Sequence, residues 1–222
     1  MQSLGIFGGT FDPVHFGHLK PVRETASALG LEQVRFVPAA NPPHRPEPVA
    51  DTRNRLAMIR LALKDYPEFR IDERELNRTG SSYTINTLES YRAEFGANLP
   101  IMMLVGADVF NEFNTWHQWQ QIPDLTHIIV MTRPGHPVVN TSFFDNENGN
   151  NPSWKTSKNI NDLHSQPQGL VFFQDVTPVN ISATKIRLLL EKEMTGDTSL
   201  LQALPPSVIE HIKLNNLYTK HP

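Results

Sequence analysis

Two histidines near the N-terminus, His15 and His18, are the first residues in the chain whose types and spacing could do chemistry. They lie in the stretch GIFGGTFDPVHFGHLK, where a short apolar run ends in two glycines, and a threonine and an Asp-Pro pair follow. Such a stretch fits a metal site, a phosphate-binding site or a tight turn with incidental histidines. The residues around the pair favour one of these three interpretations.

Phosphate binding accounts for more of the stretch than either alternative. A zinc site needs three or four protein ligands, but the chain has no cysteine, and Asp12 is the only nearby carboxylate with suitable spacing. A plain turn needs the glycines and the Asp-Pro pair but not the histidines. Glycines let backbone N–H groups approach an anion, imidazoles donate hydrogen bonds to phosphate oxygens, and Gly17 leaves room for a base or sugar. The motif is neither a P-loop nor G-x-G-x-x-G.

These residues need a strand before them and a helix after them, and the hydrophobic pattern predicts both. Residues 4–7 form an apolar run, the apolar positions of 16–29 have helical spacing, and residues 34–38 predict a second strand. Strand, helix and strand with short connections indicate a right-handed unit of parallel strands. The phosphate site would lie beyond the carboxyl end of the first strand, where open α/β sheets bind ligands.

The alternation of strands and helices continues to the C-terminus. Further strands are predicted at 69–72, 101–108, 127–133 and 169–175, separated by helical patterns that include one capped by Ser182. The fold class is therefore α/β: a Rossmann-like open, mainly parallel sheet with helices on both faces. We predict one domain over residues 1–222, with a proline-rich lid loop at 39–51 and an irregular, mobile insertion at about 138–168.

The composition indicates an ordinary cytoplasmic protein. The formal net charge is −3, so no broad basic surface points to nucleic acid as a partner. No signal-peptide pattern opens the chain and no apolar run is long enough to span a bilayer, so no membrane partner is expected. The lack of cysteine excludes disulfides and fits a reducing compartment. The oligomeric state is not readable from the sequence.

Motifs at both ends of the chain resemble those of a known superfamily. GGTFDPVHFGH resembles the signature of the H-x-G-H nucleotidyltransferases, and ISATKIR (181–187) resembles their second signature, I-S-x-T-x-x-R. The landmarks between them, PPHRP, SSYT, VGADVF, TW and TRPG, are similar to those of bacterial nicotinate-mononucleotide adenylyltransferases. The resemblance runs nearly end to end and lapses mainly in the Asn-rich insertion. It implies a nucleotidyltransferase-type fold and the reaction of nicotinate mononucleotide with ATP to give deamido-NAD and pyrophosphate.

The resemblance implies a role for each matching residue on the ATP side. His15, His18 and Arg187 would be catalytic, with His18 at the α-phosphoryl group and Arg187 as a forked cation. The expected ATP-binding residues are Gly8, Gly9, Thr10, Phe11, Gly106, Asp108, Arg133, Ile181, Ser182 and Thr184. Taken alone, Ser182 and Asp108 also fit ordinary helix caps. No metal ligand is expected from the protein, and Mg²⁺ would be carried by ATP and pyrophosphate.

The expected nicotinate-nucleotide-binding residues are Thr84, Trp116, His117, His44 and Arg45. Trp116 would stack on the pyridine ring, while Thr84 and His117 would lie near the nicotinate carboxylate. Trp119 competes with Trp116, since residues three apart on one helical turn share a face, and a core position is the alternative for Trp116. His44 and Arg45 lie on the proline-rich loop, which would close over phosphates or remain solvated.

Four other functions remain open at this stage. Nicotinamide mononucleotide as acceptor differs by an amide in place of a carboxylate, which no side chain in the sequence decides. Phosphopantetheine adenylyltransferases are shorter and lack the SSYT and TW landmarks. A fragment of a class I aminoacyl-tRNA synthetase would show a K-M-S-K-S-like loop. A nucleotide-sensing or metal-binding module would not need the intact set of His15, His18, Ser182, Thr184 and Arg187.

Overall fold

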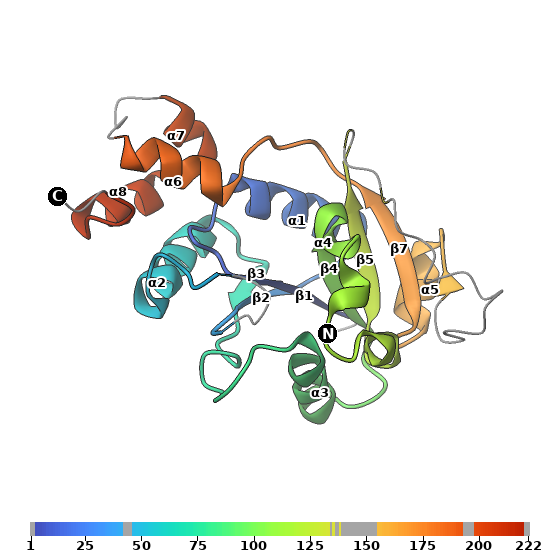
Figure 1. Cartoon of the computed structure of the whole chain (residues 1–222). Coiled ribbons are helices and arrows are strands. Elements are labelled where there is room, and N and C mark those ends of the chain that lie inside the picture. The colour runs from blue at the N-terminus through green and yellow to red at the C-terminus, as the bar shows by residue number, and fades with distance from the viewer. Residues whose placement is uncertain are drawn as a thin grey trace.

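The computed structural model describes residues 3–41, 46–133, 135, 138, 155–192 and 198–219. In that part of the chain, parallel strands form one seven-stranded sheet of order β3-β2-β1-β4-β5-β7-β6 (Figure 1). The strands are β1 (Leu4–Gly9), β2 (Val34–Pro38), β3 (Phe69–Ile71), β4 (Ile101–Gly106), β5 (His127–Thr132), β6 (Lys155–Thr156) and β7 (Leu170–Asp175). The predicted fold class is confirmed.

The strand order reverses between β1 and β4, which are neighbours in the sheet although two other strands separate them in sequence. Strands β2 and β3 continue the sheet on one side of β1, and β5 and β7 continue it beyond β4. Residues Ile101–Val105 of β4 are all buried, because helices cover both faces of a parallel sheet. The carboxyl ends of β1 and β4 therefore flank a topological switch point, where such sheets bind ligands.

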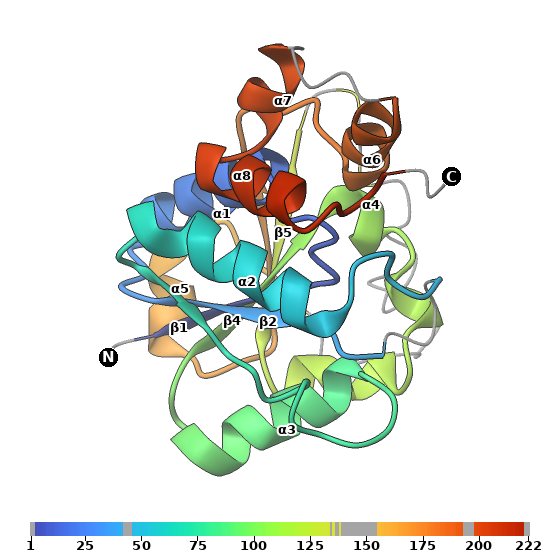
Figure 2. The same ribbon diagram turned by 90° about the vertical axis from the view of Figure 1, so that its left-hand side faces the viewer.

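Helices cover both faces of the sheet. They are α1 (Phe16–Ala28), α2 (Thr52–Ala62), α3 (Thr84–Phe95), α4 (Ala107–Phe110), α5 (Ile160–Ser165), α6 (Ala183–Glu191), α7 (Thr198–Ala203) and α8 (Pro206–Leu214), with 3₁₀ turns at Leu63–Asp65, Phe113–Thr115 and Trp119–Asp124. One hydrophobic cluster joins the sheet to α1, α2 and α5–α8, and a second joins its other face to α3 and α4 (Figure 2). Within the described ranges, no helix is long and apolar enough to cross a membrane.

Two predictions of local structure are wrong. The segment 155–168 is not irregular: it contains β6 and α5, and α5 packs into the core through the buried Leu163. Asn159 caps α5 by accepting a hydrogen bond from the backbone N–H of Asn161. Residues 139–154 of the expected insertion lie outside the described residues. The strand expected at 101–108 ends at Gly106, because α4 begins at the next residue.

Candidate active site

The side chain of Phe11, in the loop between β1 and α1, is buried in the hydrophobic core. Phe11 has a positive φ of 53° and is 2% exposed. The centroid of its ring lies 5.8 Å from that of Phe7, 5.7 Å from that of Phe36 and 5.3 Å from that of His18. The side chain of Phe11 therefore belongs to the core, and its predicted contact with ATP is restricted to its backbone. The ring of Phe11 also packs edge-on against the ring of His18.

The two histidines are stacked at the start of α1. Their ring centroids are 3.7 Å apart with an interplanar angle of 18°. The backbone N–H of His15 donates a hydrogen bond to Nδ1 of His18 at 3.3 Å, so the proton of neutral His18 resides on Nε2. Burial lowers the pKa of His15 to about 4, and this side chain is therefore neutral at pH 7. A neutral His15 can stack closely on His18 without charge repulsion.

Gly17 is required by packing within the protein. A Cβ atom at this position would lie 2.9 Å from both Cε1 and Nδ1 of His15 and 3.0 Å from the carbonyl oxygen of Ile181. The missing side chain lets the first turn of α1 approach the start of the second signature. The protein's own packing therefore explains the glycine, and the expectation that Gly17 also leaves room for a base or sugar stays a prediction.

The second signature begins α6 as predicted. The hydroxyl oxygen of Ser182 caps the helix by accepting a hydrogen bond from the backbone N–H of Lys185 at 3.3 Å. Thr184 is exposed in the first turn, and Arg187 lies one turn further along. Nη1 of Arg187 donates to the backbone carbonyl of Asp12 at 2.7 Å. The two signatures, from opposite ends of the chain, are therefore joined directly.

Asp12 connects this loop to three other segments. Its carboxylate accepts hydrogen bonds from the backbone N–H groups of Val49 at 2.8 Å and Ala50 at 3.1 Å, and from the hydroxyl of Tyr218 at 2.7 Å. Oδ2 of Asp12 also lies 3.8 Å from Nη1 of Arg187. From the sequence, Asp12 fits a turn residue or a metal ligand, and its role in joining segments is not visible because its partners are far away in the sequence.

Arg55 is a second residue that the sequence analysis missed. It lies on α2 and is 1% exposed, and Nη1 donates to the carbonyl oxygens of Thr10 at 2.7 Å and Ala39 at 2.9 Å. These two carbonyls belong to the loops that follow β1 and β2. Burial lowers the pKa of Arg55, while the nearby charge of Asp12 counteracts that effect. An arginine at an inward position of a helix with apolar neighbours was the available signal.

The predicted ATP-binding residues Gly106, Asp108 and Arg133 lie at the carboxyl ends of β4 and β5, the edge of the sheet at which open α/β folds bind ligands. Gly106 ends β4 and caps α4, so the prediction that Asp108 is the cap is wrong; Asp108 is exposed in the first turn. A Cβ atom at Gly106 would lie 2.6 Å from Oδ1 of Asp108, so a larger residue at this position would displace the exposed Asp108 side chain. Arg133 follows β5, and its Nη1 lies 3.4 Å from the carbonyl oxygen of Val179, just before the second signature.

The predicted acceptor residues gather at the start of α3. Thr84 is the first residue of this helix, and the ring of the preceding Tyr83 lies 4.3 Å from the ring of His117. The ring of Trp116 lies 4.9 Å from that of Phe113 and is half-buried. Trp116 follows one 3₁₀ turn and Trp119 begins the next, so the prediction of a shared helical turn is wrong. His44 and Arg45 lie outside the described residues.

The arrangement suits anionic oxygen more than a metal ion. Between β1 and the start of α6, it presents two imidazoles, hydroxyls, helix N-termini and the guanidinium of Arg187. Within the described ranges, no group of three or more His, Asp or Glu side chains is placed to hold a metal ion. The two signatures, joined across the switch point, therefore present donors that suit the phosphate oxygens of a nucleoside triphosphate.

A family model described as cytidylyltransferase-like matches residues 6–189, from β1 to α6. The chain belongs to this family. The nicotinate-nucleotide adenylyltransferase of Salmonella typhimurium (strain LT2) is 41% identical over 222 residues, which cover 98% of this chain and 100% of the relative. The probable nicotinate-nucleotide adenylyltransferase of Serratia proteamaculans is 40% identical, with 96% of this chain and 94% of that protein covered.

A solved structure shows the same fold at much lower identity. The nicotinic acid mononucleotide adenylyltransferase of Plasmodium falciparum, complexed with NaAD, has a TM-score of 0.72 and covers 98% of each chain, with 16% sequence identity. At that identity the likeness concerns the fold alone. The cytidylyltransferase-like fold is thus retained where few of the residues are shared.

Proposed function

We propose that the protein transfers the adenylyl group of ATP to nicotinate mononucleotide, giving deamido-NAD and pyrophosphate for NAD biosynthesis in the cytoplasm. The observation that carries this proposal is the hydrogen bond between Arg187 and the backbone of Asp12, which joins the two signatures at the end of β1. The full-length relatives named nicotinate-nucleotide adenylyltransferase support the choice of acceptor.

The reaction demands alignment and charge stabilisation from the protein. A 5′-phosphate oxygen of the acceptor attacks the α-phosphorus of ATP, a P–O bond forms, and the bond to the pyrophosphate oxygen breaks. The attacking oxygen is already ionised at neutral pH, so no general base is needed. His18 donates from Nε2 to an oxygen of the α-phosphoryl group, and His15 and Arg187 bind the neighbouring phosphates. These donors stabilise the charge that develops in the transition state.

ATP enters as its Mg²⁺ complex, and the ion neutralises the triphosphate. The residues of the site fit this arrangement because their donors suit phosphate oxygens and, among the described residues, no carboxylate cluster competes for the ion. Ser182, at the N-terminus of the nine-residue helix α6, and the exposed Thr184 bind the β- and γ-phosphate oxygens. The glycines at the end of β1 bring backbone N–H groups to the same phosphates.

The acceptor binds between the start of α3 and the 3₁₀ turn that precedes Trp116. Tyr83 caps α3 without a side-chain hydrogen bond, so the first-turn N–H groups around Thr84 suit the carboxylate of nicotinate. Trp116 stacks on the pyridine ring, and His117 lies beside it against Tyr83. A carboxylate gains more than an amide from a helix N-terminus, and this favours the acid form of the nucleotide.

Pyrophosphate release tests the proposal. The protein is supplied with MgATP and with nicotinate mononucleotide, nicotinamide mononucleotide or phosphopantetheine in separate assays at matched concentrations. We expect rapid release with the nicotinate nucleotide and much slower release with the others. The His18→Ala variant should lose kcat by at least about 10²-fold, because one donor to the transition state is removed. Preference for another acceptor would overturn the substrate assignment, and ATP binding without turnover in the wild type would indicate a nucleotide sensor.

A further inference from the structure

One buried guanidinium binds the backbone of two loops at the carboxyl edge of the sheet. Nη1 of Arg55, on α2, donates to the carbonyl oxygen of Thr10 after β1 at 2.7 Å and to that of Ala39 after β2 at 2.9 Å. Nη2 donates to Oγ1 of Thr52 at 3.3 Å, three residues earlier in the chain, and this contact helps to fix the plane of the guanidinium. Two carbonyl groups from neighbouring strand ends therefore share one cation.

Binding a carbonyl group also fixes the direction of the N–H group that follows it. A trans peptide group is planar, so its C=O and N–H point to opposite sides of the chain. Because Arg55 binds the carbonyl of Thr10, the N–H of Phe11 is turned away from the guanidinium. In the same way, the bound carbonyl of Ala39 sets the direction of the N–H of Ala40.

These two N–H groups belong to different sides of the candidate active site. The backbone of Phe11 is part of the first signature, to which the proposed function assigns phosphates of ATP. The N–H of Ala40 donates to Oγ of Ser82 at 3.1 Å. Ser82 lies two residues before Thr84, which begins α3 and to which the proposed function assigns the acceptor. Arg55 is therefore connected to each side through one peptide group.

We propose that Arg55 is a positioning residue for adenylyl transfer: by binding the carbonyls of Thr10 and Ala39, it holds the loop after β1 and the loop after β2 in a fixed relation. This inference rests on the proposed function, because that function places ATP at the first loop and the acceptor beside the second. Arg55 is 1% exposed, so it acts through the loops and not on the reacting atoms. A misplacement of the reacting groups by about 1 Å can lower the rate about 10²-fold.

Arg92 is the matched control, because it binds carbonyl groups at the opposite edge of the sheet. It lies on α3, which covers the other face of the sheet from α2 (Figure 2). Its side chain donates to carbonyl oxygens just before three strands: Leu99 before β4 at 2.6 Å, Leu125 before β5 at 2.8 Å and Pro167 before β7 at 2.9 Å. Burial lowers the pKa of both arginines. The two residues thus make the same kind of contact at opposite ends of the strands, and of the two it is Arg55 that makes it beside the candidate active site.

Steady-state kinetics of Arg55→Met and Arg55→Lys test the inference, with Arg92→Met and Arg92→Lys as controls. Methionine fills space without donating, whereas the ammonium of the shorter lysine side chain can still donate to a carbonyl group. We expect kcat/KM of the folded protein to fall about 10²-fold in Arg55→Met and about tenfold in Arg55→Lys. The Arg92 variants should also unfold at lower urea concentration, but their kcat/KM should stay within about twofold of the wild type, because the loops after β1 and β2 remain in place.

The fall in the Arg55 variants should lie mainly in kcat. Each loop can still bind its own substrate, so the Kd for MgATP, measured by calorimetry, should rise less than about threefold. If Arg55→Met does not fold, the two lysine variants carry the comparison. A fall of kcat/KM no larger in the Arg55 variants than in the Arg92 variants would overturn the inference, and so would a change confined to the KM of one substrate.

Hydrogen exchange gives a readout that does not depend on turnover. The amide of Ala40 should exchange faster in Arg55→Lys than in the wild type, and at the wild-type rate in Arg92→Lys. Unchanged exchange at Ala40 in Arg55→Lys would show that Arg55 does not orient this peptide group. A wild type that forms no deamido-NAD from nicotinate mononucleotide would refute the proposed function instead, and exchange at Ala40 would still decide whether Arg55 holds the loop after β2.

Discussion

Two buried aspartates, Asp12 and Asp72, have similar surroundings and different consequences. They are 6% and 7% exposed, and each accepts a hydrogen bond from a tyrosine hydroxyl: Tyr218 at 2.7 Å for Asp12 and Tyr91 at 2.9 Å for Asp72. Each also lies near an arginine. The remaining partners differ. Asp12 binds the backbone of a loop, whereas Asp72 binds mainly other side chains and one backbone N–H group two residues away.

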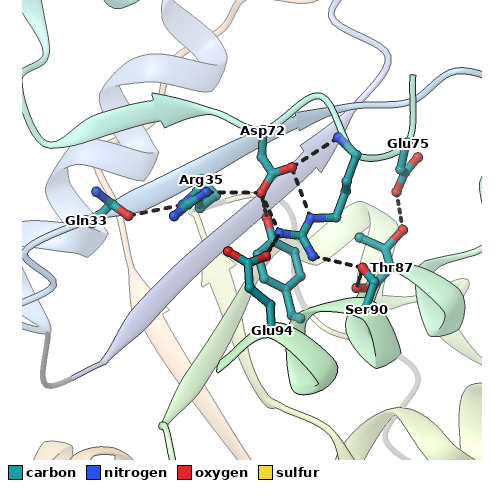
Figure 3. Close-up of polar contacts among 9 residues, drawn as sticks. Gln33, Arg35, Asp72, Glu75, Thr87, Ser90 and Glu94 are labelled. Atoms are coloured by element: carbon teal, nitrogen blue, oxygen red, sulfur yellow. Dashed lines mark hydrogen bonds and ion pairs between the residues drawn. The ribbon is translucent and has the colours of Figure 1, made fainter. Parts of the chain in front are cut away.

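The partners of Asp72 are side chains of the protein that the candidate active site does not include: Arg74, Arg35 and Tyr91. Nε and Nη2 of Arg74 donate to its two carboxylate oxygens at 3.0 and 2.8 Å, and Nη1 of Arg35 lies 3.3 Å away (Figure 3). Burial alone would raise the pKa of Asp72, but the hydrogen bonds from Arg74 and Tyr91 outweigh it and lower the pKa. Such a network holds β2, β3 and α3 together. Asp12 instead joins the loop after β1 to the segment before α2, where the proposed function places ATP, so we expect it to affect catalysis.

Replacing Arg187 by alanine should have the largest effect. It removes a cation from the phosphates and the hydrogen bond that joins α6 to the loop of Asp12. We expect kcat/KM to fall about 10²- to 10³-fold, as for other donors to a transition state. The fall should occur without a large change in Tm, since the Arg187 side chain is 30% exposed. Steady-state kinetics and thermal unfolding measure the two effects.

Lys185→Ala is the control for this variant. Lys185 is exposed on the same helix, and its Nζ binds Oδ1 of Asn180 at 3.1 Å. Its kcat/KM should stay within about twofold of the wild type, as for a surface substitution with no partner in the site. A loss in Lys185→Ala similar to that in Arg187→Ala would show that α6 acts by its net charge and not by the contact with Asp12.

Asp72→Asn should affect stability instead. It removes the more buried of the two carboxylate partners of Arg74, while Glu94 still accepts from Nη2. We expect the free energy of unfolding to fall by about 2 kcal/mol, as for a lost hydrogen bond between charged groups. Urea unfolding measures this loss. The kcat/KM of the folded fraction should match the wild type. A large loss of activity at full folding would contradict the distinction between the two aspartates.

The pH dependence of the free energy of unfolding should distinguish the loop of Asp12, which contains His15, from the network of Asp72. The pKa of His15 is lowered from 6.5 to about 4, so the unfolded chain binds this proton first as the pH falls. Stability from His15 is complete above about pH 6.5 and is lost as the pH falls toward 4, a loss of roughly 3 kcal/mol. Burial also lowers the pKa of His127, which adds to the same range. Stability from Asp72, whose pKa is lowered from 3.8, is lost only at lower pH.

Unfolding measured from about pH 8 to pH 3 in His15→Asn and Asp72→Asn checks these ranges. The slope of the free energy of unfolding between pH 6.5 and 4 should be shallower in His15→Asn, with the part due to His127 remaining. The slope below pH 3.8 should be shallower in Asp72→Asn. If the slope between pH 6.5 and 4 is the same in His15→Asn as in the wild type, burial does not hold His15 in its neutral form.

Asp12→Asn should have a moderate effect on activity. The amide can still accept from Tyr218 or from one backbone N–H group, but its NH₂ group faces other donors, so one contact of the loop is lost. We expect kcat/KM to fall about tenfold, the equivalent of one lost hydrogen bond to a charged group. Kinetics with both substrates measure it. An unchanged kcat/KM would place Asp12 in the same structural class as Asp72.

The sequence predicted the parts of the site whose signals are local. The glycines that end β1 and the cap at Ser182 are predicted from neighbouring residues, and the bounds of β2 agree with the apolar pattern. It did not predict α5, because a six-residue helix with one buried residue, Leu163, shows no measurable period. The bounds of short elements are decided by packing that neighbouring residues do not reveal.

The polar contacts that join the loops could not be predicted from the sequence, because their partners are far apart along the chain. Tyr218 and Asp12 are 206 residues apart, and Arg187 and Asp12 are 175 residues apart. No local rule relates such positions, and a tyrosine near the C-terminus looks like an ordinary surface residue. Arg55 differs, because its inward position among apolar residues of α2 was a local signal. Only the folded structure, which brings α6 and the C-terminal Tyr218 to the loop after β1, shows that these side chains meet.

The smallest expected effect comes from the two tyrosines. Tyr91→Phe and Tyr218→Phe each remove one hydroxyl from a buried carboxylate and should each lower the free energy of unfolding by about 1 kcal/mol. Tyr218→Phe should also lower kcat/KM about twofold, because the carboxylate of Asp12 then holds Val49 and Ala50 less firmly, whereas Tyr91→Phe should not. Equal stability losses with unequal activities would show that the two carboxylates differ in what they hold and not in how strongly they are held. Equal activities would remove that distinction.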